Sequence, residues 1–135
     1  MGGAPRRAGH RLSRSDRRQV DGRTYRLAGS GAAGAHLSLA LFAYPLHPPG
    51  RPEQTHDGHL ASIDVPTLFC SGSRDTYASP DELRNAASLV RHSSVQFLEG
   101  ADHGFAVLKS SGRARDDVYA EAVAALLSFI ATLSP

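Results

Sequence analysis

The sequence lacks any apolar run approaching the roughly 20 residues that a membrane span requires, so we expect a soluble protein with no membrane partner. It has a single cysteine, Cys70, which excludes an internal disulfide and fits a reducing compartment such as the cytoplasm. We interpret Cys70 as a small buried hydrophobic residue, with a reactive thiol as the alternative. The length of 135 residues and the 41% hydrophobic content allow one domain with a modest core.

Positive charge is concentrated at one end of the chain. Residues 1–26 carry eight arginines against Asp16 and Asp21, whereas the remaining residues hold seven Lys or Arg against eleven Asp or Glu. Residues 1–36 are rich in Arg, Gly and Ala and show no usable hydrophobic periodicity. We therefore expect a disordered segment without strand or helix over residues 1–36, followed by a folded domain over residues 37–135.

Apolar patterns beyond residue 37 predict strands and helices in the order strand, strand, helix, strand, helix. Short continuous apolar runs predict buried strands at residues 39–44, 65–70 and 95–98. Helices are expected from residue 79 to about residue 90 and from residue 116 to residue 133. This order is typical of the end of an open, mostly parallel α/β sheet.

The two predicted helices carry different signals. Ser79, Pro80 and Glu82 form a strong start for the first helix, with an N-cap, a proline at the first position and an acid three residues after the cap. Its expected buried face consists of Leu83, Ala86, Ala87 and Val90. The expected buried face of the second helix consists of Val118, Ala122, Val123, Leu126, Leu127, Ile130 and Leu133. We expect Tyr119, on the same helix, to serve in packing.

Two polar side chains follow neighbouring predicted strands. Asp75 comes after the strand at residues 65–70, and His103 comes after the strand at residues 95–98. Adjacent parallel strands would bring both side chains to the carboxyl edge of the sheet, where ligands meet α/β folds. A carboxylate that accepts the Nδ1 proton leaves Nε2 free to take a proton from a hydroxyl nucleophile. The pattern predicts a catalytic acid–base pair; the alternative is that Asp75 caps a turn and His103 is an ordinary loop residue.

Four stretches carry a resemblance to a known family. They read Tyr-Pro-Leu-His-Pro-Pro-Gly at 44–50, Val-Pro-Thr-Leu-Phe at 65–69, Gly-Ser-Arg-Asp at 72–75 and Glu-Gly-Ala-Asp-His at 99–103. From about residue 39 to residue 133 the sequence resembles the C-terminal part of an α/β-hydrolase. The proline-rich loop resembles the small dienelactone-hydrolase-like branch. The resemblance implies an open, mostly parallel sheet that is incomplete at the N-terminus.

The resemblance also implies an activity and roles for residues. It implies hydrolysis of ester-like or other acyl bonds in a small-molecule substrate, with no cofactor. Asp75 would be the triad acid and His103 the triad base, while His47 would either line the substrate entrance or hydrogen-bond the loop backbone. The nucleophile is unknown, because the family's Gly-x-Ser-x-Gly elbow does not occur here. Ser30 lies between glycines and is a weak candidate, better interpreted as part of a flexible loop; Ser71 and Ser73 are too near Asp75.

Residues 17–24, Arg-Arg-Gln-Val-Asp-Gly-Arg-Thr, lie where the elbow would be expected. One back-translation of this stretch, read one base later, encodes Gly-Gly-Lys-Ser-Met-Gly-Gly-Arg. Residues 1–36 are therefore interpreted as an out-of-frame reading of the elbow region. The alternatives are an organelle transit peptide, which would need clearer amphipathic spacing, and a nucleic-acid-binding segment, which would need interleaved aromatics.

With the elbow and the strands before it missing, we expect this truncated chain to be catalytically inert and marginally folded. The alternative is a non-catalytic interaction module on a hydrolase-derived fold, which would self-associate through exposed strand edges. No metal is expected, because the spacing of His56, Asp57, His59, Asp102 and His103 matches no compact ligand motif. His56 and His59 lie in a polar loop beside prolines and are interpreted as solvated loop residues.

Overall fold

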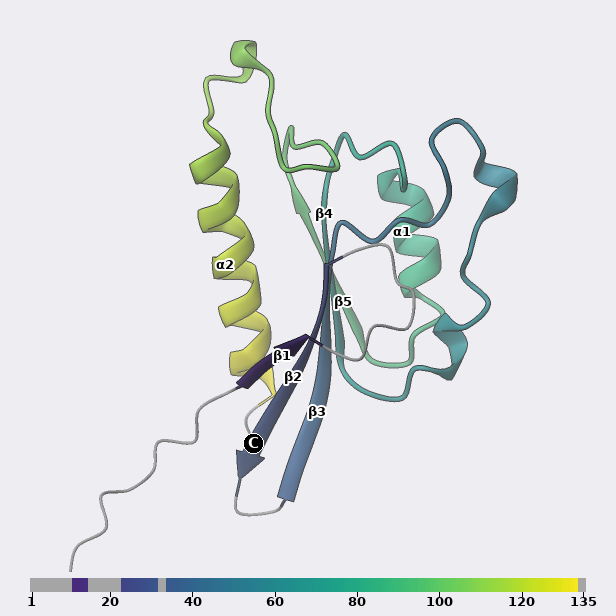
Figure 1. Ribbon diagram of the computed structural model, residues 1–135, viewed down its shortest axis with the longest axis vertical. Helices are drawn as coiled ribbons and strands as arrows, with labels where there is room; N and C mark the ends of the chain where they lie inside the picture. Colours follow the sequence, from purple (N-terminus) through teal and green to yellow (C-terminus); the bar gives the residue numbers. More distant parts are fainter. Residues whose placement is uncertain (1–10, 15–22, 32–33, 134–135) are drawn as a thin grey trace, which may run out of the picture.

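The computed structural model describes residues 11–14, 23–31 and 34–133, and side chains from residue 37 onward. Five strands form one sheet in chain order (Figure 1). The strands are β1 (Arg11–Arg14), β2 (Arg23–Gly31), β3 (Gly34–Phe42), β4 (Thr67–Gly72) and β5 (Ser93–Leu98). The helices are α1 (Pro80–Ala87) and α2 (Arg115–Thr132), with short 3-10 turns η1 (Pro52–Gln54), η2 (Leu60–Ser62) and η3 (Lys109–Ser111).

Strands β3, β4 and β5 run parallel to one another. Phe42 pairs with Cys70, and Cys70 in turn pairs with Gln96, so the three strands reach one edge of the sheet together. α1 connects β4 to β5, as parallel strands require a crossover. The predicted α/β fold class is confirmed, and each strand and helix expected beyond residue 37 is present with bounds shifted by a few residues.

Strands β1 and β2 were not predicted. They pair antiparallel with each other and β2 pairs antiparallel with β3, which starts at Gly34 rather than at residue 39. The expectation that residues 1–36 contain no strand is therefore wrong for residues 11–14, 23–31 and 34–36. Composition misled the prediction, because an Arg- and Gly-rich stretch can still pair through its backbone when a neighbouring strand offers its edge. Residues 1–10, 15–22 and 32–33 lie outside the described part.

The core has two halves, one on each face of the sheet. α2 covers one face and α1 the other (Figure 1). Every residue of β4 is buried, as expected of a central strand covered on both sides. Its side chains alternate between the halves: Leu68 and Cys70 pack toward α2, and Phe69 packs toward α1. The strand that leads to Asp75 is thus covered by the core on both faces.

α1 forms as predicted. The Ser79 side chain accepts a hydrogen bond from the Glu82 backbone N–H at 3.3 Å, and the Glu82 carboxylate accepts one from the Ser79 N–H at 3.0 Å. This capping box satisfies two backbone donors that a helix start otherwise leaves unpaired. All four residues of the predicted buried face are buried, namely Leu83, Ala86, Ala87 and Val90.

α2 differs from its prediction in the face it buries. Val118 and Ala122 are buried as expected, and Phe129 is buried without having been predicted. The other predicted residues that pack half-buried against the same core are Leu126, Ile130 and Leu133. Val123 and Leu127 are instead 54% and 61% exposed, which corrects the predicted face. α2 is apolar around most of its circumference, so periodicity could not select one side.

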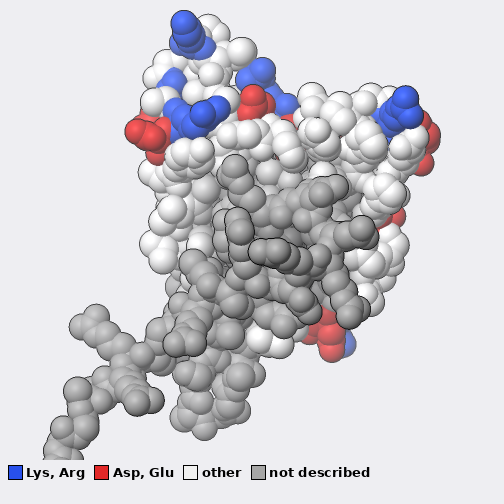
Figure 2. Space-filling model, viewed as in Figure 1, with Lys and Arg blue, Asp and Glu red and all other residues white. Residues whose placement is uncertain are grey.

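Charge is mixed on the described surface. Figure 2 shows Lys and Arg side chains beside Asp and Glu side chains, with no patch of one sign among the described residues on the visible face. Neither α1 nor α2, the helices in the described residues, has the length and apolarity that a membrane crossing requires.

Candidate active site

Asp75 and His103 meet at the carboxyl edge of the parallel strands. β4 ends at Gly72 and β5 at Leu98, and each is followed at once by the loop that carries one of the two side chains. His103 Nδ1 lies 2.9 Å from Asp75 Oδ2. The two residues that the sequence singled out are therefore in direct contact.

The two loops are joined by their backbones. The Ser73 N–H donates to the Leu98 carbonyl at 3.0 Å, and the Arg74 N–H donates to the Ala101 carbonyl at 2.9 Å. The Gly100 N–H donates to the Ser73 hydroxyl at 2.8 Å. Hydrogen bonds on both sides of the contact hold the loops at a fixed separation, which defines the distance between the carboxylate and the imidazole.

A compact turn presents His103. The Asp102 carboxylate accepts hydrogen bonds from the Gly104 and Ala106 N–H groups, both at 2.9 Å. Phe105 has a φ of 65° and its side chain is buried, so the turn is anchored in the core at the cost of a left-handed residue. Asp102 thus shapes the turn, and the imidazole beside it remains 35% exposed.

Both carboxylate oxygens of Asp75 have a hydrogen-bond partner. Its side chain is fully buried, and its second oxygen, Oδ1, accepts a hydrogen bond from the Tyr77 N–H at 2.8 Å. An ionised carboxylate only accepts, so Nδ1 of His103 is the donor to Asp75. In a neutral imidazole with this donor, Nε2 keeps its lone pair, the arrangement that a general base needs.

A comparison with protein families matches most of the chain. Residues 21–131 match the family model described as an alpha/beta hydrolase domain. The chain belongs to the alpha/beta hydrolase family. Neither the curated proteins nor the solved structures give a match to this chain. The matched range includes both loops of the Asp75–His103 pair and all strands from β2 to β5.

No serine hydroxyl is among the described contacts of His103, whose one hydrogen bond within the described residues runs to Asp75. Ser30 pairs with Ala35, at the amino end of β3, whereas the pair lies at the carboxyl edge of the sheet. The register does not bring Ser30 to His103. Ser71 is fully buried, and the Ser73 hydroxyl is used by the Gly100 N–H. Residues 17–22 of the predicted elbow position lie outside the described residues.

His47 is placed in the loop after β3. Its Nδ1 donates to the Pro48 carbonyl at 2.8 Å, and its Nε2 lies 2.7 Å from the Glu82 carboxylate. A protonated Nε2 can only donate toward the carboxylate, so this contact is an ion pair when His47 is charged. The Pro48 carbonyl and Glu82 together raise the pKa of His47, and His47 in turn lowers the pKa of Glu82. His47 therefore anchors its loop to the start of α1.

Three further residues considered from the sequence, His59, Cys70 and Tyr119, make packing or hydrogen-bond contacts away from the Asp75 carboxylate. His59 Nε2 lies 2.9 Å from the Tyr44 hydroxyl, and burial raises the pKa of that hydroxyl to about 12. Burial likewise raises the pKa of Cys70 to about 12, which keeps its thiol protonated. Tyr119 packs edge-on against Phe105. The described part of the chain contains no group of side chains suited to hold a metal ion.

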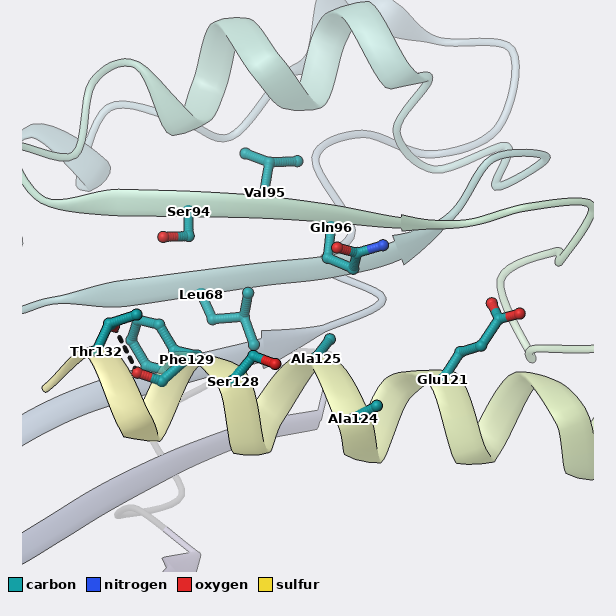
Figure 3. A pocket seen from close by; sticks show the side chains of 10 residues that line it. All are labelled: Leu68, Ser94, Val95, Gln96, Glu121, Ala124, Ala125, Ser128, Phe129 and Thr132. Atoms are coloured by element: carbon teal, nitrogen blue, oxygen red, sulfur yellow. Dashed lines mark hydrogen bonds between the residues drawn. The ribbon is translucent and has the colours of Figure 1, made fainter.

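A hollow of about 440 Å³ lies elsewhere, between β5 and α2 (Figure 3). It is lined largely by small side chains such as Ala125 and Ser128, and its one charged residue, Glu121, pairs with Arg113 at 2.6 Å. Leu68 and Ser94, near the amino ends of their strands, form part of the wall. The hollow therefore does not open onto the Asp75–His103 pair, and we do not assign it to catalysis.

Tyr77 is a site residue that the sequence analysis missed. Its ring stacks on the His103 imidazole, with centroids 4.1 Å apart and planes 28° from parallel. The available signal was its place two residues after Asp75, where an aspartate often accepts a backbone N–H in a turn. That signal predicts the N–H contact to the carboxylate, but it does not predict the stacking.

Proposed function

We propose that Asp75 and His103 are the acid and the base of a serine hydrolase site for ester-like or other acyl bonds. In the complete enzyme a serine hydroxyl attacks the acyl carbon while His103 Nε2 takes its proton. Asp75 stabilises the imidazolium that forms, and His103 then returns the proton to the leaving group. The observation that carries this proposal is the 2.9 Å contact between Nδ1 and a fully buried carboxylate at the carboxyl edge of the sheet.

The first test concerns the pair itself and needs no turnover. Nitrogen-15 NMR of the imidazole is expected to show the Nδ1–H tautomer for His103 in the native chain. In Asp75→Asn, an amide that can present its NH₂ group to Nδ1 is expected to reverse or mix the tautomers. His92→Gln, which changes an exposed histidine, leaves the His103 signals in place. An unchanged His103 tautomer in Asp75→Asn contradicts the acid–base assignment.

The second test concerns activity. We propose that this chain does not hydrolyse p-nitrophenyl acetate, because the described contacts of His103 include no hydroxyl. Hydrolysis by the purified chain that is lost in His103→Ala would overturn this part.

The out-of-frame interpretation is tested on the gene: the next reading frame over residues 17–24 must encode a Gly-x-Ser-x-Gly peptide. If it does, the protein from the corrected frame should hydrolyse the ester and lose at least about a hundredfold in rate in His103→Ala.

The narrower assignment to a dienelactone-hydrolase-like branch belongs to the same proposal. Its support is the Pro-Leu-His-Pro-Pro-Gly loop at residues 45–50 and the placement of His47 in it. The contacts of His47 with Pro48 and Glu82 favour an anchoring role in that loop over direct substrate contact. In the corrected-frame protein, His47→Gln should therefore change stability more than substrate selectivity.

A second candidate function is favoured by the exposed apolar side of α2 and by β5, the last strand of the described sheet. β5 contains no charge, proline or glycine, the usual protection of an edge strand. We propose as the alternative a non-catalytic module that associates with a second copy. Concentration-dependent dimerisation in sedimentation, without esterase activity, supports this alternative, and a monomer at all concentrations rejects it.

A further inference from the structure

The Tyr77 ring covers one face of the His103 imidazole. The centroid distance of 4.1 Å and the 28° angle describe a stacked contact rather than an edge contact. A side chain hydrogen-bonded at Nδ1 alone can still rotate about that bond. Stacking against a second plane removes this freedom, so the Nε2 lone pair is aimed in one direction.

Tyr77 is itself fixed by its backbone on both sides. Its N–H donates to Asp75 Oδ1 at 2.8 Å, the oxygen that His103 does not use. Its carbonyl accepts hydrogen bonds from the Leu46 and His47 N–H groups, both at 3.1 Å. One residue therefore connects the buried acid, the imidazole ring and the proline-rich loop.

The loop that holds the Tyr77 carbonyl is anchored in turn. His47 in that loop is paired with Glu82 at 2.7 Å, and Glu82 belongs to the capping box of α1. Movement of the loop would pull on the Tyr77 backbone, and hence on both Asp75 and His103. The path from the proline-rich loop to His103 consists of hydrogen bonds, one ion pair and one ring contact.

We propose that Tyr77 is a positioning residue for His103, acting by ring stacking on the imidazole and by its N–H bond to the acid. This inference rests on the acid–base pair proposed above. Removing the ring should leave the Asp75 contact possible while widening the range of imidazole orientations. Tyr77 acts through His103 and has no assigned contact with substrate.

The experiment is NMR of the His103 ring in the native chain and in Tyr77→Phe, Tyr77→Leu and Tyr77→Met. A stacked ring shifts the imidazole carbon-bound protons upfield and gives nuclear Overhauser contacts to the Tyr77 ring, and we expect both in the native chain and in Tyr77→Phe. Tyr77→Leu should lose the upfield shift and broaden the signals. It should also raise the rate at which diethyl pyrocarbonate modifies His103, measured by mass spectrometry. Phe97→Leu, which removes a half-buried aromatic ring that packs beside Arg84 and the core under α1, is the matched control.

The outcomes separate this inference from the proposed function. If Asp75→Asn alters the His103 tautomer but Tyr77→Leu changes neither the ring shift nor the modification rate, Tyr77 is no positioning residue and the pair stands. If Asp75→Asn leaves the tautomer unchanged, the pair itself fails. Should Tyr77→Leu not fold, Tyr77→Met supplies the same readout, and absence of Overhauser contacts in the native chain overturns the inference without any variant.

Discussion

His47 and Glu82 form a second histidine–carboxylate pair, and its residues shift each other's pKa. The pKa of His47 is raised from its ordinary 6.5, so its contribution to stability is complete below pH 6.5 and is lost as pH rises through the folded value. The pKa of Glu82 is lowered from 4.5, so its contribution is complete above pH 4.5 and is lost as pH falls through the folded value. Between these limits both charges are present.

We predict that His47→Gln loses most stability, relative to the native chain, between about pH 4.5 and pH 6.5. At pH 9 the neutral imidazole presents a lone pair to the carboxylate, so the difference in the free energy of unfolding should shrink. Urea denaturation at pH 4, 6 and 9 measures it. His92→Gln, at an exposed position, should show no such profile; a His47→Gln deficit that is equal at all three pH values is the contradicting result.

At the residue scale, the sequence predicted the Asp75–His103 pair but not the Tyr77 ring that stacks on the imidazole. Asp75 and His103 were identifiable because each follows a short apolar run, and parallel strands end at one edge. Tyr77 was not identifiable as a stacking partner, because the contact depends on how two loops fold over each other. His47 was placed in the correct loop, whereas its pairing with Glu82 depends on the position of α1.

Gly72, the last residue of β4, lies close against the backbone of the loop after β5. A Cβ atom at this position would overlap the Ala101 carbonyl and lie 2.7 Å from the Asp102 carbonyl oxygen. Backbone atoms cannot rotate out of the way, so the loops would have to separate. The absence of a side chain at Gly72 therefore allows the hydrogen bonds that hold the acid loop against the histidine loop.

We predict that Gly72→Ala costs about 1–3 kcal/mol of unfolding free energy, the usual range for forcing extra volume into a packed site. It should also disturb the His103 imidazole signals, because the two loops move apart. Gly58→Ala is the matched control, since nothing lies within 4 Å of a Cβ there. A Gly72→Ala variant as stable as Gly58→Ala in urea denaturation would show that the close approach does not exist in solution.

The two helices show where element-level prediction succeeds and fails. Local signals specified α1, because Ser79, Pro80 and Glu82 form its start through contacts within four residues. Five of the seven residues predicted on the buried side of α2 pack against the core. Leu127 and Val123 do not, since they are as apolar as Phe129 and which of them is buried depends on where the sheet lies. Composition decides that a helix forms; its neighbours decide which side is covered.

At the scale of the whole molecule, one side of α2 carries apolar side chains that no described residue covers. Leu127 is 61% exposed and Val123 54% exposed, one turn apart on the helix. Apolar side chains in such a row favour association when two copies meet. In a two-fold dimer each substitution is present twice, so its effect on the free energy of association is doubled.

We predict that, if the chain dimerises, Leu127→Ser weakens the dimer at least about tenfold, since burying one leucine contributes about 1.5–3 kcal/mol. Sedimentation over a range of concentrations measures the dissociation constant. Leu108→Ser removes a leucine that is 52% exposed outside α2 and should leave the dissociation constant unchanged. Equal weakening by both variants would place the contact elsewhere on the surface.

By itself the sequence determined the α/β order of elements beyond residue 37, the capped start of α1 and the meeting of Asp75 with His103, because each follows from local patterns and the geometry of parallel strands. Only the tertiary structure decided the pairing of β2 with β3, the exposed side of α2 and the stacking of Tyr77 on His103. These features depend on contacts between segments distant in the chain. Periodicity and composition describe one segment at a time, so they carry no information about which segments meet.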